Sequence, residues 1–222
     1  MTVLPIWKRL WQKMPHYKKN LRVNQSFSDH WIGQTLAYIN PFKMHVAAQI
    51  IHQGGVIAYP TEAVYGLGCH PSAIKAIQRI LDIKRRPWQK GLILVASKVD
   101  QITPYLSDEG LKLIDCFNET HKRPVTWLLP VSPEVSPLLR GNHSKIAIRL
   151  SQNPYVKALC DAANSALVST SANRAGQPEM TTAEEVRCQM AGEVDMIIVG
   201  PTGGHTRPSS IIDAQTREVL RA

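Results

Sequence analysis

The sequence predicts an α/β fold, in which helices pack against a largely buried sheet. Helical and strand patterns alternate along most of the chain, and the strand patterns are short, nearly continuous apolar runs, as is typical of strands buried on both faces. The chain has 222 residues, 44% of them hydrophobic, and shows no internal repeat or linker. This length suffices for a sizeable core. We therefore expect one body over residues 43–222, preceded by a basic N-terminal extension over residues 1–42.

The extension is predicted from its charge. Residues 1–28 contain six Lys or Arg and no acid, which leaves 20 basic and 17 acidic residues in the rest of the chain. Most of the net charge of +9 therefore belongs to the extension, and the body is only mildly basic. Apolar residues recur at helical spacing from Ile6 to Met14. A disordered basic arm, a docked helix and translated sequence upstream of the true start are the three interpretations, and we favour an arm or loosely docked segment.

The first elements of the body follow from apolar periodicity and from glycine. A stripe from Val46 to Ile51 predicts a helix that begins near Lys43 and stops at Gly54-Gly55. Val56–Tyr59 is then a predicted strand, and the glycine-bearing residues 60–69 are predicted to form a loop.

The next helix is opened by Pro71 and Ser72 and carries apolar residues on one side as far as Leu81. Strand Leu92–Val95 follows, and residues 98–121 predict two short helices. Later helices are expected from Pro154 and from Thr182, where Glu185 is placed for a capping box. The remaining predicted strands are residues 125–129, 146–150, 166–168, 196–199 and 210–212.

Several motifs of common chemistries are missing. No GxxxxGK[ST], HExxH or GxSxG occurs, and Gly66-Leu67-Gly68 lacks a third glycine at dinucleotide spacing. The histidines show no ligand spacing and the four cysteines form no CxxC pair, so we expect no protein-held metal. Buried free thiols in a reducing cytoplasm are the simpler account, with a reactive thiol at Cys69 as the alternative. No apolar run of about eighteen residues predicts a membrane span, so we expect a cytoplasmic protein.

A basic junction joins the second helix to the strand that follows it. Lys84, Arg85, Arg86 and Lys90 lie there within seven residues. Pro87 disfavours helix at Arg86, and in an extended segment Lys84 and Arg86 can point the same way. Two such cations suit a polyphosphate, because arginine matches phosphate oxygens with a planar fork and lysine adds a compact charge. A solvated basic loop is the alternative.

Other polar residues follow or interrupt the predicted strands. Ser169, Ser171 and Asn173 are spaced by two and can face one ligand, although a polar turn is the alternative. Arg149 interrupts an apolar strand, and a buried arginine needs a ligand or an acid nearby. Thr61 and Glu62 directly follow a strand, where a β-turn at Pro60 is the alternative. Thr126 lies early in another strand, where a buried hydroxyl facing backbone is the alternative.

Six motifs stand in the order found in the YrdC-like family. They are Tyr59–Gly68, Lys84–Pro87, Pro124–Thr126, Ile146–Arg149, Ser169–Asn173 and Ser209–Asp213. Each motif is weak alone, but six in order are specific. From about residue 43 to the end, the chain resembles threonylcarbamoyl-AMP synthases of the short type. The resemblance implies a single YrdC-like domain, with a twisted mixed sheet flanked by helices and an open basic cavity.

The resemblance also implies an activity and a site. L-threonine, bicarbonate and ATP would give threonylcarbamoyl-AMP and pyrophosphate, and downstream proteins would use the product to modify tRNA. The family's KxR and SxN signatures fall on Lys84, Arg86, Ser171 and Asn173 as catalytic residues. The second set implied by the matching is Thr61, Thr126 and Arg149 for threonine or carbamate, with Ser169 and Ser209 on the nucleotide side. Mg²⁺ would arrive bound to ATP, because the sequence has no cluster of acidic residues that would predict a metal site made by the protein alone.

The chain also departs from the family pattern. Arg123-Pro124 replaces a frequent Gly-Pro, and Trp88–Gly91 replaces an Asn-Pro-Leu type of sequence. The competing hypothesis is a module that binds double-stranded RNA or tRNA, or a ribosome-maturation factor, without its own catalysis. Such a module would show RNA binding with a steep salt dependence. The small positive excess of the body argues against it, whereas the basic extension favours an RNA contact.

Overall fold

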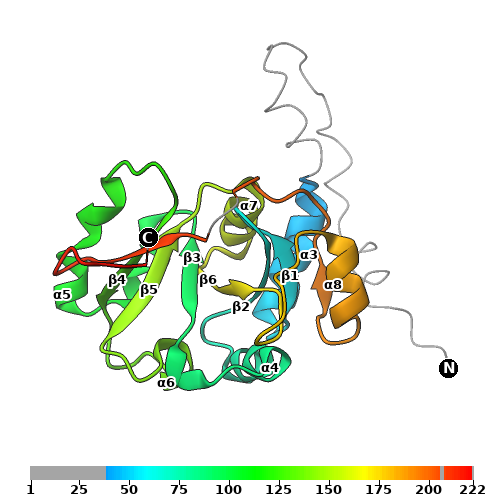
Figure 1. The fold of residues 1–222 in the computed structure, drawn as a ribbon, viewed down its shortest axis with the longest axis horizontal. Helices are drawn as coiled ribbons and strands as arrows, with labels where there is room; N and C mark the ends of the chain where they lie inside the picture. The colour runs from blue at the N-terminus through cyan, green and yellow to red at the C-terminus, as the bar shows by residue number, and fades with distance from the viewer. Residues whose placement is uncertain (1–38, 206–207, 222) are drawn as a thin grey trace, which may run out of the picture. The chain divides into compact units, whose positions relative to one another are not determined.

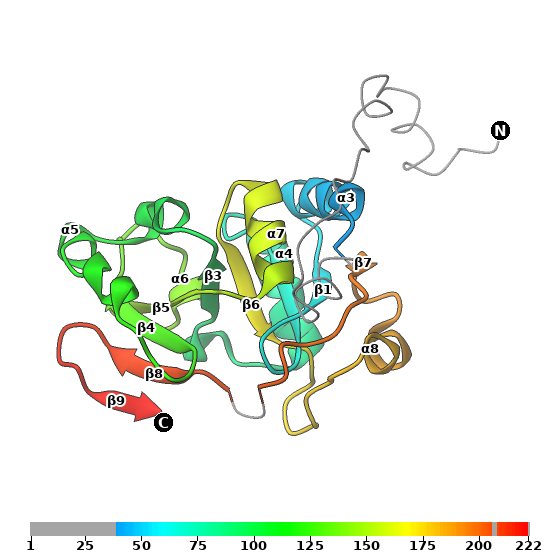
Figure 2. The ribbon, with the colours of Figure 1, turned by 90° about the horizontal axis from the view of Figure 1, so that it is seen from above.

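The structure is a computed structural model that describes residues 39–205 and 208–221. The predicted amphipathic segment Ile6–Met14 lies outside the described residues, as does most of the predicted extension 1–42. Helices and strands alternate around a mixed sheet (Figures 1 and 2), which confirms the predicted α/β class. Across these two ranges, we find no helix with the length and apolar character needed to cross a membrane.

The sheet of the described residues has nine strands in the spatial order β7-β1-β2-β6-β3-β5-β4-β8-β9. Their bounds are β1 Ile57–Pro60, β2 Tyr65–Cys69, β3 Ile93–Ala96, β4 Val125–Pro130, β5 Lys145–Leu150, β6 Leu167–Ser171, β7 Met196–Ile197, β8 Ser210–Asp213 and β9 Val219–Arg221. The pairs β1–β7, β3–β5 and β4–β8 are parallel, and all other neighbours are antiparallel.

The helices are α3 Pro41–His52, α4 Ile74–Lys84, α5 Asp108–Leu111, α6 Pro137–Arg140, α7 Pro154–Ala163 and α8 Ala183–Met190. Four 3₁₀ turns are η1 Trp88–Lys90, η2 Val99–Gln101, η3 Thr103–Tyr105 and η4 Ile114–Asn118. The predicted capping box of α8 is confirmed, because Thr182 accepts from the Glu185 amide and Glu185 accepts from the Thr182 amide. Residues 98–121, predicted as two short helices, form mostly 3₁₀ turns.

The prediction that residues 60–69 form a loop is wrong in its second half. Strand β2 pairs there with β1 as an antiparallel hairpin. A Cβ on Gly68 would lie 2.6 Å from the Val168 carbonyl oxygen and 2.8 Å from Cε1 of Tyr59. Glycine is therefore required by close packing inside a strand, and it hides the strand pattern.

Helices cover the two faces of the sheet unequally. On one face, Leu67, Leu94 and Val168 pack against α4 in the larger core cluster. On the other face, Leu167 and Val95 pack with α3 and α7 in a second cluster. The strand register gives this second face a row of Ser169, Ile93, Ala147 and Leu128, from β6 to β4.

The second face is only partly covered. Ile93, Ala147 and Leu128 remain partly exposed, whereas Leu167 and Val95, under the helices, are fully buried. Polar strand residues next to this row therefore border an open region. This is where the predicted site residues gather.

Candidate active site

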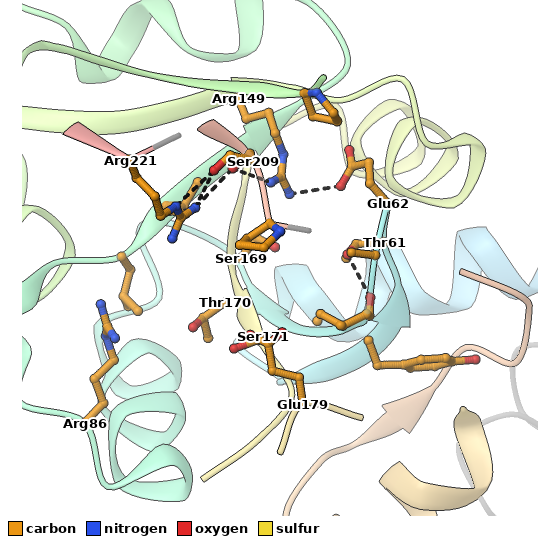
Figure 3. A pocket seen from close by; sticks show the side chains of 18 residues that line it. Thr61, Glu62, Arg86, Arg149, Ser169, Thr170, Ser171, Glu179, Ser209 and Arg221 are labelled. Atoms are coloured by element: carbon orange, nitrogen blue, oxygen red, sulfur yellow. Dashed lines mark hydrogen bonds and ion pairs between the residues drawn. The ribbon is translucent and has the colours of Figure 1, made fainter. Parts of the chain in front are cut away.

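The open part of the sheet contains a hollow of about 310 Å³ (Figure 3). Segments far apart in the sequence line it: the β1–β2 turn, the residues after α4, strands β3, β5 and β6, the loop that carries Glu179, the residues before β8, and strand β9. Its polar and charged lining residues are Thr61, Glu62, Arg86, Arg149, Ser169, Thr170, Ser171, Glu179, Ser209 and Arg221. Three arginines against two glutamates make the lining cationic.

Most of the predicted site residues line this hollow. They are Thr61, Arg86, Arg149, Ser169, Ser171 and Ser209. The other three, Lys84, Asn173 and Thr126, are outside the lining, but each is hydrogen-bonded to a residue that lines it. The nine predicted residues therefore form one cluster, in which six line the hollow and three lie behind them.

We call Glu62, Arg149 and Ser209 the arginine wall. Nη2 of Arg149 lies 3.1 Å from Oε2 of Glu62, and Nη1 donates to Oγ of Ser209 at 3.3 Å. The side chains of Arg149 and Glu62 are 12% and 11% exposed. Ser151 donates its hydroxyl to the other oxygen of Glu62. The acid that a buried arginine requires is therefore Glu62. A guanidinium has five N–H donors, and across residues 39–205 and 208–221 Arg149 forms no other hydrogen bond or ion pair, so N–H groups remain for a ligand.

Two further residues fix Ser209 in this wall. The fully buried hydroxyl of Thr126 lies 2.8 Å from Oγ of Ser209. The guanidinium of Arg221 donates to the Ser209 carbonyl oxygen from Nε at 3.0 Å and from Nη2 at 2.7 Å. Thr126 thus bonds a side chain and not the backbone, and its place is behind the wall.

We call Lys84, Ser171 and Asn173 the lysine clamp. Nζ of Lys84 donates to the carbonyl oxygens of Ser171 and Asn173 and to Oδ1 of Asn173, the last two at 2.9 and 3.0 Å. Ser171 donates its hydroxyl to the same Oδ1 at 2.7 Å. Burial, and then the charge of Arg86, lower the pKa of Lys84 to about 8. The clamp holds the end of β6 against the end of α4.

The clamp corrects the expectation that Lys84 and Arg86 lie side by side in an extended segment. Lys84 is the last residue of α4, and Arg85 adopts the left-handed conformation at φ 50° and ψ 45°. The amide of Arg86 donates to the Leu81 carbonyl oxygen, which closes the helix in a Schellman motif. Lys84 and Arg86 therefore do not share an extended segment, and of the two only Arg86 lines the hollow.

The floor of the hollow depends on Gly66 in β2. A Cβ there would lie 3.0 Å from Cγ2 of Thr61 and 3.5 Å from Oγ of Ser169. Any side chain at Gly66 would therefore enter the space between these two hydroxyl-bearing residues. On the far face of β2, burial raises the pKa of the Cys69 thiol to about 12, which argues against a reactive thiol there.

Three charged lining residues were not predicted as site residues. Glu62 adjoins Thr61 after a strand, and its pairing with Arg149 depends on a contact across 87 residues that the sequence does not display. Arg221 belongs to β9, a short exposed edge strand without a recognisable pattern. Glu179 follows Pro178 in a polar loop and carries no signal that sets it apart from other surface acids.

Comparison with known proteins, by sequence and by structure, leads to the same group of proteins. The sequence model of Sua5, YciO and YrdC proteins, described as "Telomere recombination", matches residues 49–222. A double variant of P. abyssi Sua5 is 27% identical with a TM-score of 0.75, over 82% of this chain and 56% of that chain. P. abyssi Sua5 complexed with L-threonine is 28% identical with a TM-score of 0.72, over 79% and 52%.

The structure of E. coli YciO is 25% identical with a TM-score of 0.66, and the match covers 82% of this chain and 92% of that chain. The chain therefore spans about half the length of the Sua5 chains that it matches and nearly all of the YciO chain.

Proposed function

Because the chain belongs to the Sua5, YciO and YrdC family, we propose that it is a threonylcarbamoyl-AMP synthase. In this reaction the amine of L-threonine combines with bicarbonate, with loss of water, to give a carbamate. A carbamate oxygen then attacks the α-phosphorus of ATP, and pyrophosphate leaves. The product would supply downstream proteins that modify tRNA. The likeness to a Sua5 that was solved with L-threonine supports threonine as a substrate.

One observation carries this proposal. A single hollow is lined by Arg149, whose guanidinium is only partly engaged by Glu62 and Ser209, and by two further arginines, Arg86 and Arg221. Figure 3 shows Arg149 between Glu62 and Ser209, with Arg86 drawn well away from that pair. An arginine with free N–H groups can bind the carboxylate of an amino acid, and separate cations can bind a polyphosphate. The hollow therefore has places for both substrates.

The chain's residues would act by alignment and charge stabilisation. Thr61 and Ser169 line the same hollow as Arg149. The Thr61 hydroxyl donates to the Val64 carbonyl oxygen at 2.7 Å, so it would act toward the amino acid and its carbamate as an acceptor. Arg86 would offset the charge that moves onto the leaving pyrophosphate. Because this displacement depends on positioning more than on covalent help, no nucleophilic side chain is required.

The decisive experiment measures pyrophosphate release by the purified chain with ATP, L-threonine and bicarbonate. Release should require all three substrates. Arg86→Gln should lower kcat/KM about 100-fold, because a charge-assisted hydrogen bond contributes roughly 1.5–3 kcal/mol. Arg187→Gln, which changes an exposed arginine of α8, should leave the rate unchanged.

Two results would count against the proposal. Wild-type activity in Arg86→Gln would show that Arg86 has no role in the reaction. A wild-type chain that binds tRNA but releases no pyrophosphate would instead favour the RNA-binding hypothesis.

A further inference from the structure

We propose that Glu179 is the carboxylate that receives a divalent cation carried by the phosphates of the nucleotide. This inference rests on the proposed function, because it assumes that ATP occupies the hollow. It assigns a metal contact to Glu179, which lies in the loop between β6 and α8.

The first observation is that Glu179 is out of place electrostatically. The hollow is lined by Arg86, Arg149 and Arg221, which suits an anionic ligand. A free carboxylate in the same lining would repel a triphosphate. Glu62, the other acid of the lining, has its charge balanced by Arg149. Glu179 forms no ion pair within 4.0 Å among the residues that the structure describes.

The second observation is where Glu179 lies. It lines the hollow together with Ser171, and Figure 3 draws it at the Ser171 end, away from the pair of Arg149 and Glu62. Burial lowers the pKa of both Lys84 and Arg221, and the negative charge of Glu179 acts on both in the opposite direction. The carboxylate therefore lies within electrostatic range of two cations from different segments, Lys84 of α4 and Arg221 of β9.

The third observation is that the backbone of this residue is anchored. The next residue, Met180, accepts from the Tyr65 amide at 2.7 Å and donates to the Ala172 carbonyl oxygen at 3.3 Å. Pro178 restricts the backbone on the other side. Glu179 is exposed, but the main chain of its neighbour Met180 is hydrogen-bonded to β2 and to Ala172 just after β6. These hydrogen bonds hold Glu179 at the rim of the hollow.

These features match the way proteins bind Mg²⁺ with nucleotides. Mg²⁺ usually retains several waters and is bound by one or two carboxylates together with substrate phosphates. Within the two described ranges, His, Cys, Asp and Glu form no group of three or more that could hold a metal alone. A single carboxylate beside the phosphate position fits a shared site of this kind. The cation would convert the repulsion between Glu179 and the phosphates into attraction.

The test measures ATP affinity by titration calorimetry, with MgCl₂ and with a chelator, in the wild type, Glu179→Gln and Glu109→Gln. Glu109 is an exposed acid of α5 that is outside the hollow, so its variant is the matched control. In the wild type, Mg²⁺ should tighten ATP binding about tenfold, and in Glu179→Gln by less than about threefold. Without the metal the order should reverse, and Glu179→Gln should bind ATP about threefold more tightly than the wild type because the repulsion is gone.

The crossing of the two affinities supports the inference. If Glu179→Gln shows the wild-type dependence on Mg²⁺, the cation is held by the phosphates alone and the inference is wrong, whereas the proposed function stands. If the wild type binds no ATP in either condition, both fall. Glu109→Gln should behave like the wild type, and a change there as large as in Glu179→Gln would show a general effect of surface charge and overturn the inference.

Discussion

The lysine clamp and the arginine wall use a buried cation in opposite ways. In the clamp, all three hydrogen bonds from Nζ of Lys84 end on oxygens of Ser171 and Asn173, two of them carbonyl oxygens of the main chain. In the wall, Arg149 meets one carboxylate and one hydroxyl, both from side chains, and retains N–H groups beyond these contacts. An ammonium has three donors and a guanidinium has five, so only the second has donors left.

This difference distinguishes a cation that positions a loop from a cation that can bind a ligand. A cation whose donors are all taken by the protein fixes the position of a loop, whereas one with free donors can also hold an anion. We therefore infer that Lys84 shapes the hollow and that Arg149 contacts the proposed ligand. The distinction would disappear if both residues gave the same phenotype on substitution, and three variants test this.

The largest effect is expected for Arg149→Gln. The substitution removes the ligand's donors and leaves the Glu62 carboxylate buried without its counter-charge. Losing one partner of a buried pair costs about 3–5 kcal/mol of unfolding free energy. Threonine affinity should fall about 100-fold with the loss of a charge-assisted contact. Urea unfolding and calorimetric titration of L-threonine measure the two effects.

The double variant Glu62→Gln with Arg149→Gln is the control for Arg149→Gln. It removes the unpaired carboxylate, so it should recover most of the stability and none of the threonine affinity. Recovery of affinity in the double variant would contradict a direct contact between Arg149 and the ligand.

A smaller loss of stability, about 2 kcal/mol, is expected for Lys84→Met. The carbonyl oxygens of Ser171 and Asn173 would lose their donor while partly buried, at a cost of about 1–3 kcal/mol. Threonine affinity should change less than in Arg149→Gln, because the arginine wall remains intact. Urea unfolding gives the first quantity and threonine titration the second. Lys90→Met, at an exposed lysine of the same junction, should match the wild type in stability.

The contrary result for Lys84→Met is equally clear. Wild-type stability combined with complete loss of ATP binding would mean that the ammonium serves the ligand and not the loop. The clamp and the wall would then be equivalent, and the comparison would fail.

The sequence predicted the elements whose interactions are local. The apolar runs 125–129 and 146–150 were recognised as strands, and the structure has β4 at Val125–Pro130 and β5 at Lys145–Leu150. The capping box of Thr182 and Glu185 was visible from its spacing alone. Strand β2 was missed because its glycines serve tight packing against β1 and β6. Strand β9 was missed because an exposed edge strand shows no apolar pattern.

The same distinction applies to the site. The six motifs identified the nine predicted positions, and the structure places them in or directly behind one hollow. Which of Lys84 and Arg86 lines the hollow was not predictable, because that depends on the left-handed turn at Arg85, which a sequence rich in Lys and Arg does not reveal. The pairing of Arg149 with Glu62 depends on tertiary structure in the same way.

The smallest effect, and one of opposite sign, is expected for Arg85→Gly at the turn between the clamp and the hollow. Arg85 has φ 50°, a conformation that costs a residue with a Cβ about 1–2 kcal/mol and glycine almost nothing. Glycine also adds freedom to the unfolded chain, which offsets about 0.4–1 kcal/mol of that gain. The net result should be a stabilisation of about 0.5 kcal/mol, measured by urea unfolding.

Arg85→Ala is the matched control for Arg85→Gly, because it removes the same charge but keeps the Cβ. It should give no stabilisation. Threonine and ATP affinities should stay at wild-type values in both variants, since Arg85 is exposed and lies outside the lining of the hollow. Equal stabilisation by alanine and glycine would assign the effect to charge repulsion among Lys84, Arg85 and Arg86, and not to the backbone. The left-handed turn at Arg85 lies between Lys84, which belongs to the clamp, and Arg86, which lines the hollow, so relieving its strain should leave the clamp and the proposed binding unchanged.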